Sequence, residues 1–384
     1  MRIAIVSDTF QPEINGVTTV LRRMVDGLSA MGHEVRVVAP QYPTDAAPEP
    51  GELRIPSVSF PPYPDVRFAL PAIRRVSHFM RAFSPDVMHV ATEGPLGWTG
   101  RHVAINQGIP LVTSYHTNFP IACRDYGVSW LEPVIWKWIE WFHRPAVLTQ
   151  TPGEAARDML HEHGLPQATV WGRGVDVSFF NPRRRSEMWR RTHRIPGSDV
   201  VVTHVGRLAR EKNMPVLLEA LNLLRDTALS SMTYVIAGGG PMRDEVVERS
   251  PFARHFGFLD REALADLYAN SDLCVLPSQR ETCGLVALEA MASGVPVIAA
   301  DARGFRESID HDVTGLLVPP DDARSLAAAI GRLAGSVGLR RSMAQRARRF
   351  AESRDADREN VSLVELYQIV VNGKGEAPCS VALS

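Results

Sequence analysis

Short apolar runs alternate with amphipathic segments along almost the whole chain, and this alternation constrains the fold more than any other feature of the sequence. Apolar residues between Val17 and Met31 recur at helical spacing up to Gly32, which is typical of a helix and its end. Near-continuously apolar strands separated by helices predict a parallel sheet covered on both faces. In the first half, strands are expected at Arg2–Ser7, Glu34–Ala39, Asp86–Val90, Pro110–Ser114 and Ala146–Thr149.

The second half of the chain repeats this pattern. Between the halves, the segment Trp171–Pro196 breaks the periodicity with glycines, prolines and an arginine run, and is interpreted as a linker. The sequence therefore predicts two doubly wound, Rossmann-like α/β domains facing a cleft at the carboxyl ends of their strands. The Pro-rich stretch Pro40–Pro71 is expected to be loop. In the second half, strands are expected at Val200–Val205, Thr233–Ala237, Leu273–Leu276 and Val295–Ala299, and helices at Met214–Leu224, Arg261–Ala269 and Gly284–Ser293.

Composition limits the classes of partner. The 384 residues carry a net charge of −1, which provides no overall attraction to nucleic acid or to an anionic membrane. Four scattered cysteines indicate neither a disulfide framework nor a zinc site and favour a reducing cytoplasm. The first residues are typical of a strand rather than a signal sequence, and no apolar run approaches the roughly 18–20 residues that span a bilayer. Any membrane contact is therefore expected to be peripheral.

Two cations follow the first predicted strand of the second half. Arg207 comes directly after Val205-Gly206, and Lys212, one of only three lysines in the chain, is expected to begin the next helix. Side-chain cations at a strand end can stabilise the negative charge of a departing diphosphate. The alternative interpretation is a solvated loop with salt bridges.

Two glutamates eight residues apart frame the start of a later helix, in the run from Glu281 to Glu289. The backbone N–H groups of Gly284, Leu285 and Val286 are expected to point into the cleft, where a helix N-terminus binds phosphate. Glu281 is predicted to bind sugar hydroxyls and Glu289 ribose hydroxyls. Thr282 is a further predicted donor-binding residue in this loop. Acidic residues placed near a helix N-terminus by its dipole are the structural alternative. Together with the cations, the pattern indicates an enzyme that uses nucleotide-activated sugars.

Asn15 and Gly16 follow the first strand and open the first helix. Gly16 permits close backbone approach to a phosphate or sugar, although the dinucleotide fingerprint G-x-G-x-x-G is absent. His116, just beyond a predicted strand end, is a candidate sugar ligand or a hydrogen-bonded cleft histidine. His89 and His204 lie within strand patterns and are expected in the core. The turn Gly238-Gly239-Gly240 is interpreted as structural.

A tryptophan-rich stretch is a candidate for both core and surface roles. Residues at helical spacing are predicted to be core, and the other tryptophans are candidates for contact with a bilayer interface. The loop Phe60–Pro64, upstream of Arg74, Arg75 and Arg81, is a second candidate for acceptor or membrane contact. The predicted core residues are Leu131, Ile135, Trp138, Ile139 and Phe142, and the other tryptophans are Trp130, Trp136 and Trp141.

The chain resembles the family 4 retaining glycosyltransferases of GT-B fold over nearly its whole length, to about Val371. The resemblance rests on Asn15-Gly16-Val17, on Gly206-Arg207 to Lys212, and on Glu281 to Glu289 with the following Ala290–Val297. Within the family, the chain is similar to bacterial GDP-mannose-dependent α-mannosyltransferases and to sulfoquinovosyl-diacylglycerol synthases. Ser114-Tyr115-His116-Thr117 and Arg173-Gly174-Val175-Asp176 carry that similarity.

The resemblance implies transfer of a hexose with retention, without metal or cofactor, from a nucleotide sugar to a lipid or glycan acceptor at the inner face of the membrane. It implies that Arg207 and Lys212 stabilise the diphosphate, that Glu281 and His116 bind the sugar, and that Gly16 lines the phosphate site. Cys283 replaces an aromatic residue usual in the family, and Gln279-Arg280 is unusual, so the reaction class is implied more firmly than the donor sugar.

The resemblance also implies an exchange of chain between domains. Residues 1–172 are expected to form the acceptor-side domain, joined by a last helix at 355–371. Residues 173–354 are expected to form the nucleotide-sugar domain, and the tail 372–384 is expected to be disordered. Three alternatives stay open: a glycolipid glycosyltransferase that uses a UDP-sugar, a sugar-nucleotide 2-epimerase, and a non-catalytic regulator that binds sugar nucleotides. Nucleic acid is not an expected partner.

Overall fold

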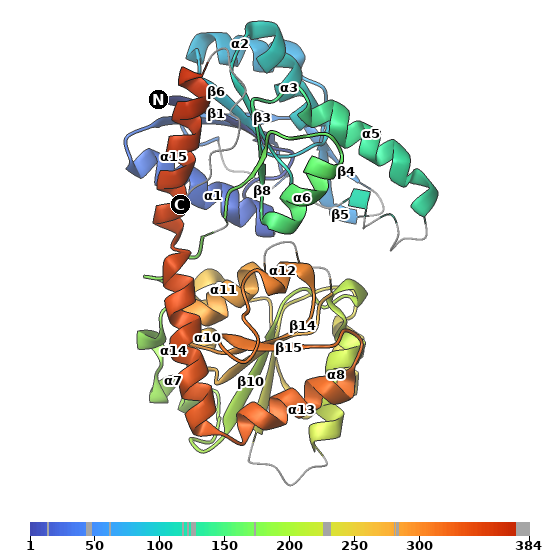
Figure 1. The fold of residues 1–384 in the computed structure, drawn as a ribbon, viewed down its shortest axis with the longest axis vertical. Helices are drawn as coiled ribbons and strands as arrows, with labels where there is room; N and C mark the ends of the chain where they lie inside the picture. The colour runs from blue at the N-terminus through green and yellow to red at the C-terminus, as the bar shows by residue number, and fades with distance from the viewer. Residues whose placement is uncertain are drawn as a thin grey trace. The chain divides into compact units, whose positions relative to one another are not determined.

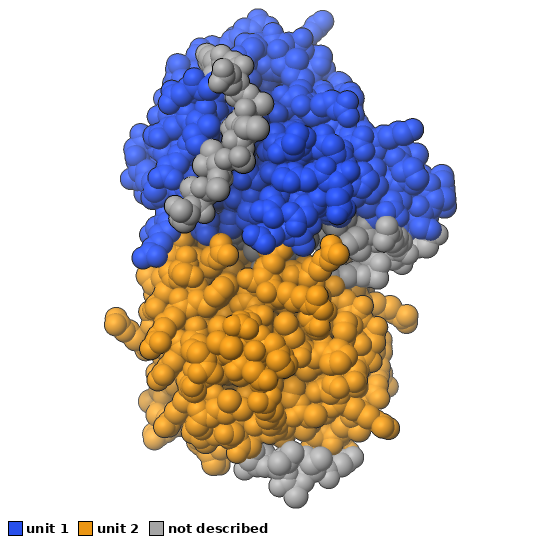
Figure 2. Space-filling view, viewed as in Figure 1, with its two compact units in different colours: residues 1–172, 357–384 blue, residues 173–356 orange. Residues whose placement is uncertain are grey.

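The computed structural model describes residues 1–13, 15–43, 48–60, 63–116, 119–120, 123, 128–172, 174–225, 232–279, 281 and 284–373. The chain divides into two compact units, coloured separately in Figure 2. Unit 1 consists of Met1–Gly172 and Asp357–Ser384, and unit 2 of Arg173–Ala356. Each unit contains its own parallel sheet and its own buried apolar clusters.

Unit 1 contains a parallel sheet of seven strands within the described residues, in the order β3-β2-β1-β6-β7-β8-β9. A separate antiparallel pair, β4-β5, lies outside this sheet. The central strands are short and almost entirely buried, as a sheet covered on both faces requires. The strands are β1 (Arg2–Val6), β2 (Glu34–Pro40), β3 (Glu52–Ile55), β4 (Ser57–Phe60), β5 (Tyr63–Ala69), β6 (Val87–Val90), β7 (Leu111–Ser114), β8 (Leu148–Thr151) and β9 (Ala168–Val170).

The helices of unit 1 begin and end at residues with clear local causes. Asn15 caps the first helix by accepting from the N–H groups of Val17 and Thr18, and Thr18 completes a capping box. Gly108, in the left-handed region, ends the third. The helices are α1 (Gly16–Ala30), α2 (Ile73–Phe83), α3 (Pro95–Gln107), α5 (Glu132–His143), α6 (Glu154–Glu162) and α15 (Ala356–Asn372) (Figure 1).

Helix α15 returns to unit 1 at the end of the chain and is bound to its core. Tyr367 is fully buried, and its hydroxyl lies 2.6 Å from Nδ1 of His89 in β6. The other ring nitrogen of His89 lies 2.6 Å from the Ser114 hydroxyl, so the histidine joins a sheet strand on one side and α15 on the other. Burial lowers the pKa of His89 to about 3, and the ring is therefore neutral. Its predicted core position is confirmed.

Unit 2 contains a parallel sheet of six strands in its described part, in the order β12-β11-β10-β13-β14-β15. The chain adds β11 and β12 on one side of β10 and then β13 to β15 on the other. The strands are β10 (Val200–Val205), β11 (Met232–Ala237), β12 (Arg254–Gly257), β13 (Leu273–Leu276), β14 (Val297–Ala300) and β15 (Gly315–Val318). The helices are α7 (Glu187–Thr192), α8 (Met214–Arg225), α9 (Arg243–Arg249), α10 (Arg261–Asn270), α11 (Leu285–Ala292), α12 (Arg303–Arg306), α13 (Ala323–Ala334) and α14 (Val337–Ser353).

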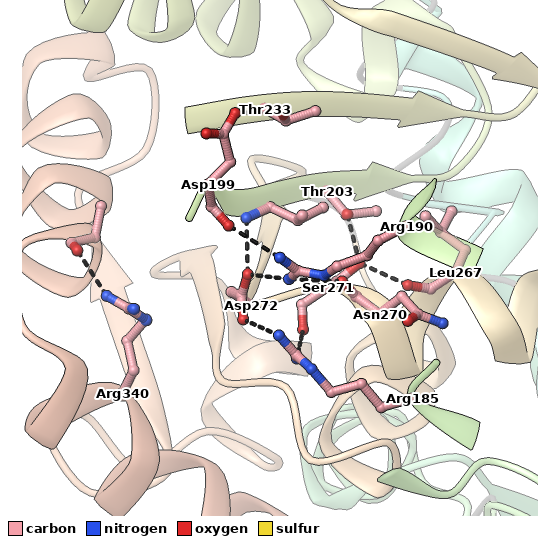
Figure 3. Close-up of polar contacts among 12 residues, drawn as sticks. Arg185, Arg190, Asp199, Thr203, Thr233, Leu267, Asn270, Ser271, Asp272 and Arg340 are labelled. Carbon is pink, nitrogen blue, oxygen red and sulfur yellow. Dashed lines mark hydrogen bonds and ion pairs between the residues drawn. The ribbon is translucent and has the colours of Figure 1, made fainter. Parts of the chain in front are cut away.

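An ionic cluster joins the predicted linker to the amino ends of β10 and β13 (Figure 3). Asp272 accepts from the backbone N–H of Val201 at 2.9 Å, from Arg190 at 2.7 Å and from Arg185 at 2.9 Å. Arg190 is 4% exposed and also donates to the carbonyls of Asp199 and Asn270. Residues 174–196 of the predicted linker therefore belong to unit 2, and α7 lies among them.

Several sequence predictions differ from the structure. Within Pro40–Pro71, expected to be loop, lie β3, β4 and β5. Three further strands, β9, β12 and β15, were not predicted. Asn372, placed in the predicted tail, is the last residue of α15, and residues 374–384 lie outside the description. No helix in the described part of the chain is long and apolar enough to cross a membrane.

The clearest difference in side-chain placement between prediction and structure is in the tryptophan-rich helix α5. Trp138, predicted to be core, is 39% exposed, whereas Trp136 is 8% exposed. The buried face of α5 is formed by Trp136, Ile139 and Phe142, which are spaced three residues apart. Trp138 therefore lies on the outward face of the helix. Ile139 and Phe142 are fully buried, as predicted.

Candidate functional site

The strand order of unit 2 has a switch point between β10 and β13. In doubly wound sheets, ligands bind in the crevice outside the carboxyl ends of the strands at such a point. Backbone pairing between these two strands joins Val202 to Leu273 and Thr203 to Cys274. The predicted diphosphate and sugar residues of unit 2 follow the carboxyl ends of these same two strands.

The loop after β10 is held by the glycine turn after β11. Leu208 donates to the Gly239 carbonyl at 2.8 Å, and Met242 donates back to the Leu208 carbonyl at 2.9 Å. A Cβ added at Gly238 would overlap the backbone of Gly206, and one added at Gly240 would crowd the backbone of Leu208. The turn is therefore structural, as predicted, and it fixes the loop that carries Arg207.

Lys212 and Glu281 form an ion pair across the two loops. Lys212 ends a short 3₁₀ turn, Arg210–Lys212, rather than beginning α8 as predicted. Its side chain is 27% exposed and that of Glu281 is 20% exposed, so both groups stay accessible to a ligand. The Ser278 hydroxyl, which donates to the Glu211 carbonyl at 3.3 Å, also joins the two loops. Arg207, in contrast, is exposed, and its side chain has no ion pair with another described residue.

Helix α11 begins at the same edge of the sheet. Its N-cap, Gly284, adopts a left-handed conformation with φ of 59° and has no side chain with which to cap the helix. The first helical bond runs from Leu288 to the Gly284 carbonyl, so the N–H groups of Leu285 and Val286 remain for another acceptor. Such a terminus favours an anion.

Glu289 lies on the buried side of α11 and is 7% exposed. It lies close enough to Tyr268 of α10 and Cys274 of β13 to affect both electrostatically. Burial, and then the charge of Glu289, raise the pKa of Tyr268 well above its usual range. The same two causes raise the pKa of the Cys274 thiol to about 12. Because the Glu289 side chain is buried, it can contact a ligand only if the ligand lies against α11.

In unit 1, Asn15 and Gly16 have different roles. The Asn15 side chain is engaged in capping α1 and in donating to Thr9 and Glu13 at 3.0 and 2.8 Å. Gly16 is exposed, and a Cβ added there would meet nothing within 4 Å. Asn15 thus positions the exposed backbone at Gly16.

His116 follows β7 and is 8% exposed. The adjacent Tyr115 is buried beside His143, whose Nε2 lies 3.4 Å from a Glu93 carboxylate oxygen. Burial, and then the charge of Glu93, raise the pKa of the Tyr115 hydroxyl. Polar side chains therefore gather at the carboxyl ends of β6 and β7, where His116 lies.

The structure brings Lys212, Glu281 and the start of α11 to one edge of unit 2, and Gly16 and His116 to the corresponding edge of unit 1. Thr282 lies outside the described residues. Sequence reasoning missed one site feature: His204, assigned to the core, is buried as predicted but directs a ring nitrogen without a described partner towards Gly206. Its only signal in the sequence is a polar residue within an apolar strand, two residues before that glycine.

Comparison with known proteins gives a consistent result. The Glycosyltransferase Family 4 model matches residues 14–179, and the model for glycosyl transferases group 1 matches residues 185–350. A GDP-mannose-dependent alpha-mannosyltransferase of Mycolicibacterium smegmatis is 38% identical over 327 residues, which cover 84% of this chain and 85% of that protein. The sulfoquinovosyl transferase SQD2 of Arabidopsis thaliana is 32% identical, over 89% of this chain and 68% of that protein.

Solved structures agree on the fold. Sucrose-phosphate synthase from Thermosynechococcus elongatus superposes with a TM-score of 0.79 at 18% identity, covering 97% of this chain and all of that one. HepE of Anabaena, solved with UDP and glucose, superposes with a TM-score of 0.75 at 20% identity, covering 96% and 99%. The chain therefore belongs to the family 4 glycosyltransferases and is a hexosyltransferase of GT-B fold.

Proposed function

We propose that the protein transfers mannose from GDP-mannose to a lipid or glycan acceptor, with retention at the anomeric carbon. The observation that carries the proposal is the pair Lys212–Glu281 at the switch point of unit 2, next to the uncapped start of α11. Relatives named GDP-mannose-dependent alpha-mannosyltransferase, 34–38% identical, support the choice of donor. A relative named alpha-monoglucosyldiacylglycerol synthase, 27% identical, supports a lipid acceptor less directly.

In this proposal, unit 2 binds the donor and unit 1 the acceptor. The diphosphate lies against Arg207, Lys212 and the N–H groups that open α11, which together oppose the charge that develops as the glycosidic bond breaks. Glu281 accepts hydrogen bonds from the sugar, and Glu289 from the ribose. Before the donor arrives, Lys212 and Glu281 neutralise each other. The donor replaces this pair with two new ones, diphosphate with Lys212 and sugar hydroxyls with Glu281.

The reaction proceeds by front-face attack. The acceptor hydroxyl bonds to the anomeric carbon on the side from which the diphosphate leaves, and its proton passes to the departing phosphate oxygen. In unit 1, His116 is proposed to position the acceptor. The cations and the helix N-terminus supply the positive charge that other transferases obtain from a metal ion, so the proposed reaction requires none.

The acceptor is proposed to be presented at a membrane surface, through helix α5. The outward side of α5 carries large apolar residues at helical spacing, and α5 lies at the periphery of unit 1 (Figure 1). Tryptophan favours the boundary between water and lipid, where its ring is buried and its N–H stays hydrated. The free cysteines Cys123 and Cys274 support a reducing compartment, and hence the cytoplasmic face. The outward apolar residues of α5 are Val134 (61% exposed), Trp138 (39%) and Trp141 (43%), and Trp130 (74%) lies in the 3₁₀ turn Ser129–Leu131 just before the helix.

Vesicle binding tests the membrane proposal. Trp130→Ser combined with Trp138→Ser should weaken binding to phosphatidylcholine vesicles by at least tenfold, because two apolar side chains leave the interface. The matched control is Met188→Ser, which removes a side chain 67% exposed on unit 2. Flotation of all three proteins measures the effect. Equal flotation of wild type and double variant would exclude α5 as the contact, whatever the activity.

Donor specificity tests the proposed reaction. Nucleotide release and sugar transfer are measured with a panel of GDP- and UDP-sugars, with and without membrane lipid extract. Release of GDP from GDP-mannose that depends on lipid, with an α-linked product, is the expected result. Preference for a UDP-sugar would replace the donor and keep the chemistry. An isomerised sugar nucleotide formed without acceptor would indicate an epimerase, and tight binding without release a regulator.

A further inference from the structure

His204 lies in β10 just beyond the point where the backbone pairing of β10 with β13 stops. The last paired residues are Thr203 and Cys274, and one residue further His204 extends its ring across the gap to the Val275 carbonyl. The side chain is 4% exposed. If His204 only replaced a missing backbone hydrogen bond between the two strands, one ring nitrogen would be enough, and the second would have no role.

The second ring nitrogen of His204 has no partner among the described residues. Nδ1 lies 2.9 Å from the Val275 carbonyl, which can only accept, so Nδ1 carries the proton of the neutral ring. Burial lowers the pKa of His204 to about 4, which keeps the ring neutral near pH 7. Nε2 is therefore an unprotonated hydrogen-bond acceptor, buried and unsatisfied. Such a group requires a donor.

Nε2 is directed towards the proposed diphosphate site. A Cβ added at Gly206, in the loop that leads to Arg207, would lie 3.6 Å from Nε2. Lys212 lies close enough for its charge to lower the pKa of His204. A diphosphate has only acceptor oxygens for such a nitrogen, whereas an ammonium has three N–H groups, of which Glu281 takes one.

We propose that His204 is a positioning residue for Lys212, whose ammonium donates to Nε2 once the donor diphosphate draws Lys212 away from Glu281. This inference rests on the proposed function. The neutral imidazole then orients the ammonium towards the leaving group and leaves its positive charge intact. A carboxylate in the same place would neutralise that charge. His204 thus acts on the reaction only through Lys212.

Two substitutions separate the two ring nitrogens. The amide nitrogen of His204→Asn takes the place of Nδ1, keeps the bond to Val275 and removes Nε2. His204→Gln extends an amide towards the position of Nε2, where its oxygen can accept from Lys212, and loses the bond to Val275. We expect His204→Asn to keep the thermal midpoint of unfolding and to lose nucleoside-diphosphate affinity and turnover. We expect His204→Gln to lower the midpoint of unfolding and to recover part of the affinity and turnover.

A double-mutant cycle with Lys212→Ala tests whether His204 acts through Lys212. Titration calorimetry with GDP and UDP measures nucleoside-diphosphate affinity in wild type, both single variants and the double variant; turnover is measured in parallel. Losing a hydrogen bond to a charged group should weaken binding and turnover about 10- to 100-fold in His204→Asn. In the Lys212→Ala background, the same change should have no further effect.

The outcomes are distinguishable. Equal losses in both backgrounds, or unchanged affinity and turnover in His204→Asn, overturn the role of His204 and leave the proposed function standing. A wild-type protein that binds neither nucleoside diphosphate overturns both, because Lys212 then has no diphosphate to meet. Losses confined to the background that contains Lys212, at an unchanged thermal midpoint, support the proposal.

Discussion

The proposed function assigns the chemistry of unit 2 mainly to two side chains, Lys212 and Glu281. Removing either leaves the other without its ion-pair partner and removes one preorganised group from the transition state. Lys212→Ala and Glu281→Ala should each lower turnover by roughly two or more orders of magnitude. Arg210→Ala, in the same 3₁₀ turn but exposed, is the control and should retain turnover. Steady-state kinetics on the purified variants test this prediction. Near-normal turnover in Lys212→Ala or in Glu281→Ala would show that the substituted residue is not catalytic.

Single residues also mark the limit of sequence reasoning about the site. That Lys212 and Glu281 come together could be predicted, because both follow the carboxyl ends of apolar runs and such ends share one edge of a parallel sheet. The unpartnered nitrogen of His204 could not, because it depends on the residue at which β10 stops pairing with β13. The engagement of Asn15 in capping, by contrast, is recognisable from Asn15 and Thr18 three residues apart.

At the scale of elements, Asp272 joins α7 and its flanking segment to the sheet of unit 2. Burial alone would raise the pKa of this carboxyl, but the hydrogen bond from Val201 and the charges of Arg185 and Arg190 outweigh it and lower the pKa below its usual range. Because the folded pKa lies below the unfolded one, the stabilisation is complete above the unfolded pKa. It is lost as the pH falls through the folded pKa.

Asp272→Asn should therefore destabilise unit 2 most near neutral pH, by about 3 kcal/mol, because Arg190 stays buried without its charged partner. The difference from wild type should shrink below about pH 4, where Asp272 of the unfolded wild-type chain begins to take up a proton. Urea unfolding between pH 7 and pH 3 measures it, with Asp244→Asn as a fully exposed control. A difference that stayed constant with pH would show that the charge of Asp272 contributes nothing.

Elements also differ in how well the sequence predicts them. Strands such as β10 and β13 were predicted correctly because they lie in the middle of a sheet and are mostly apolar and almost entirely buried. The strand β3 has one fully buried residue and β12 has none, and both end their sheets. Edge strands depend on pairing with a neighbour rather than on their own apolar pattern, so a single sequence carries little signal for them.

At the scale of the whole molecule, the proposal assigns donor binding to unit 2. Because a ligand stabilises only the state that binds it, GDP at 100 times its dissociation constant should stabilise unit 2 by about 2.7 kcal/mol. Hydrogen exchange followed by mass spectrometry should report this protection in peptides of unit 2, strongest around 206–212 and 284–289, with little change in unit 1. Protection confined to unit 1 would contradict the assignment.

The return of α15 to unit 1 has a consequence for how the protein is made. The first unit is interrupted in sequence by the whole of the second, and the hydroxyl that meets His89 is supplied by Tyr367, close to the end of the described chain. During translation, unit 2 can complete its sheet and core before unit 1 has received its last helix. The unit that is synthesised first is therefore expected to finish folding last. Until α15 has been synthesised, the face of unit 1 that it covers remains exposed.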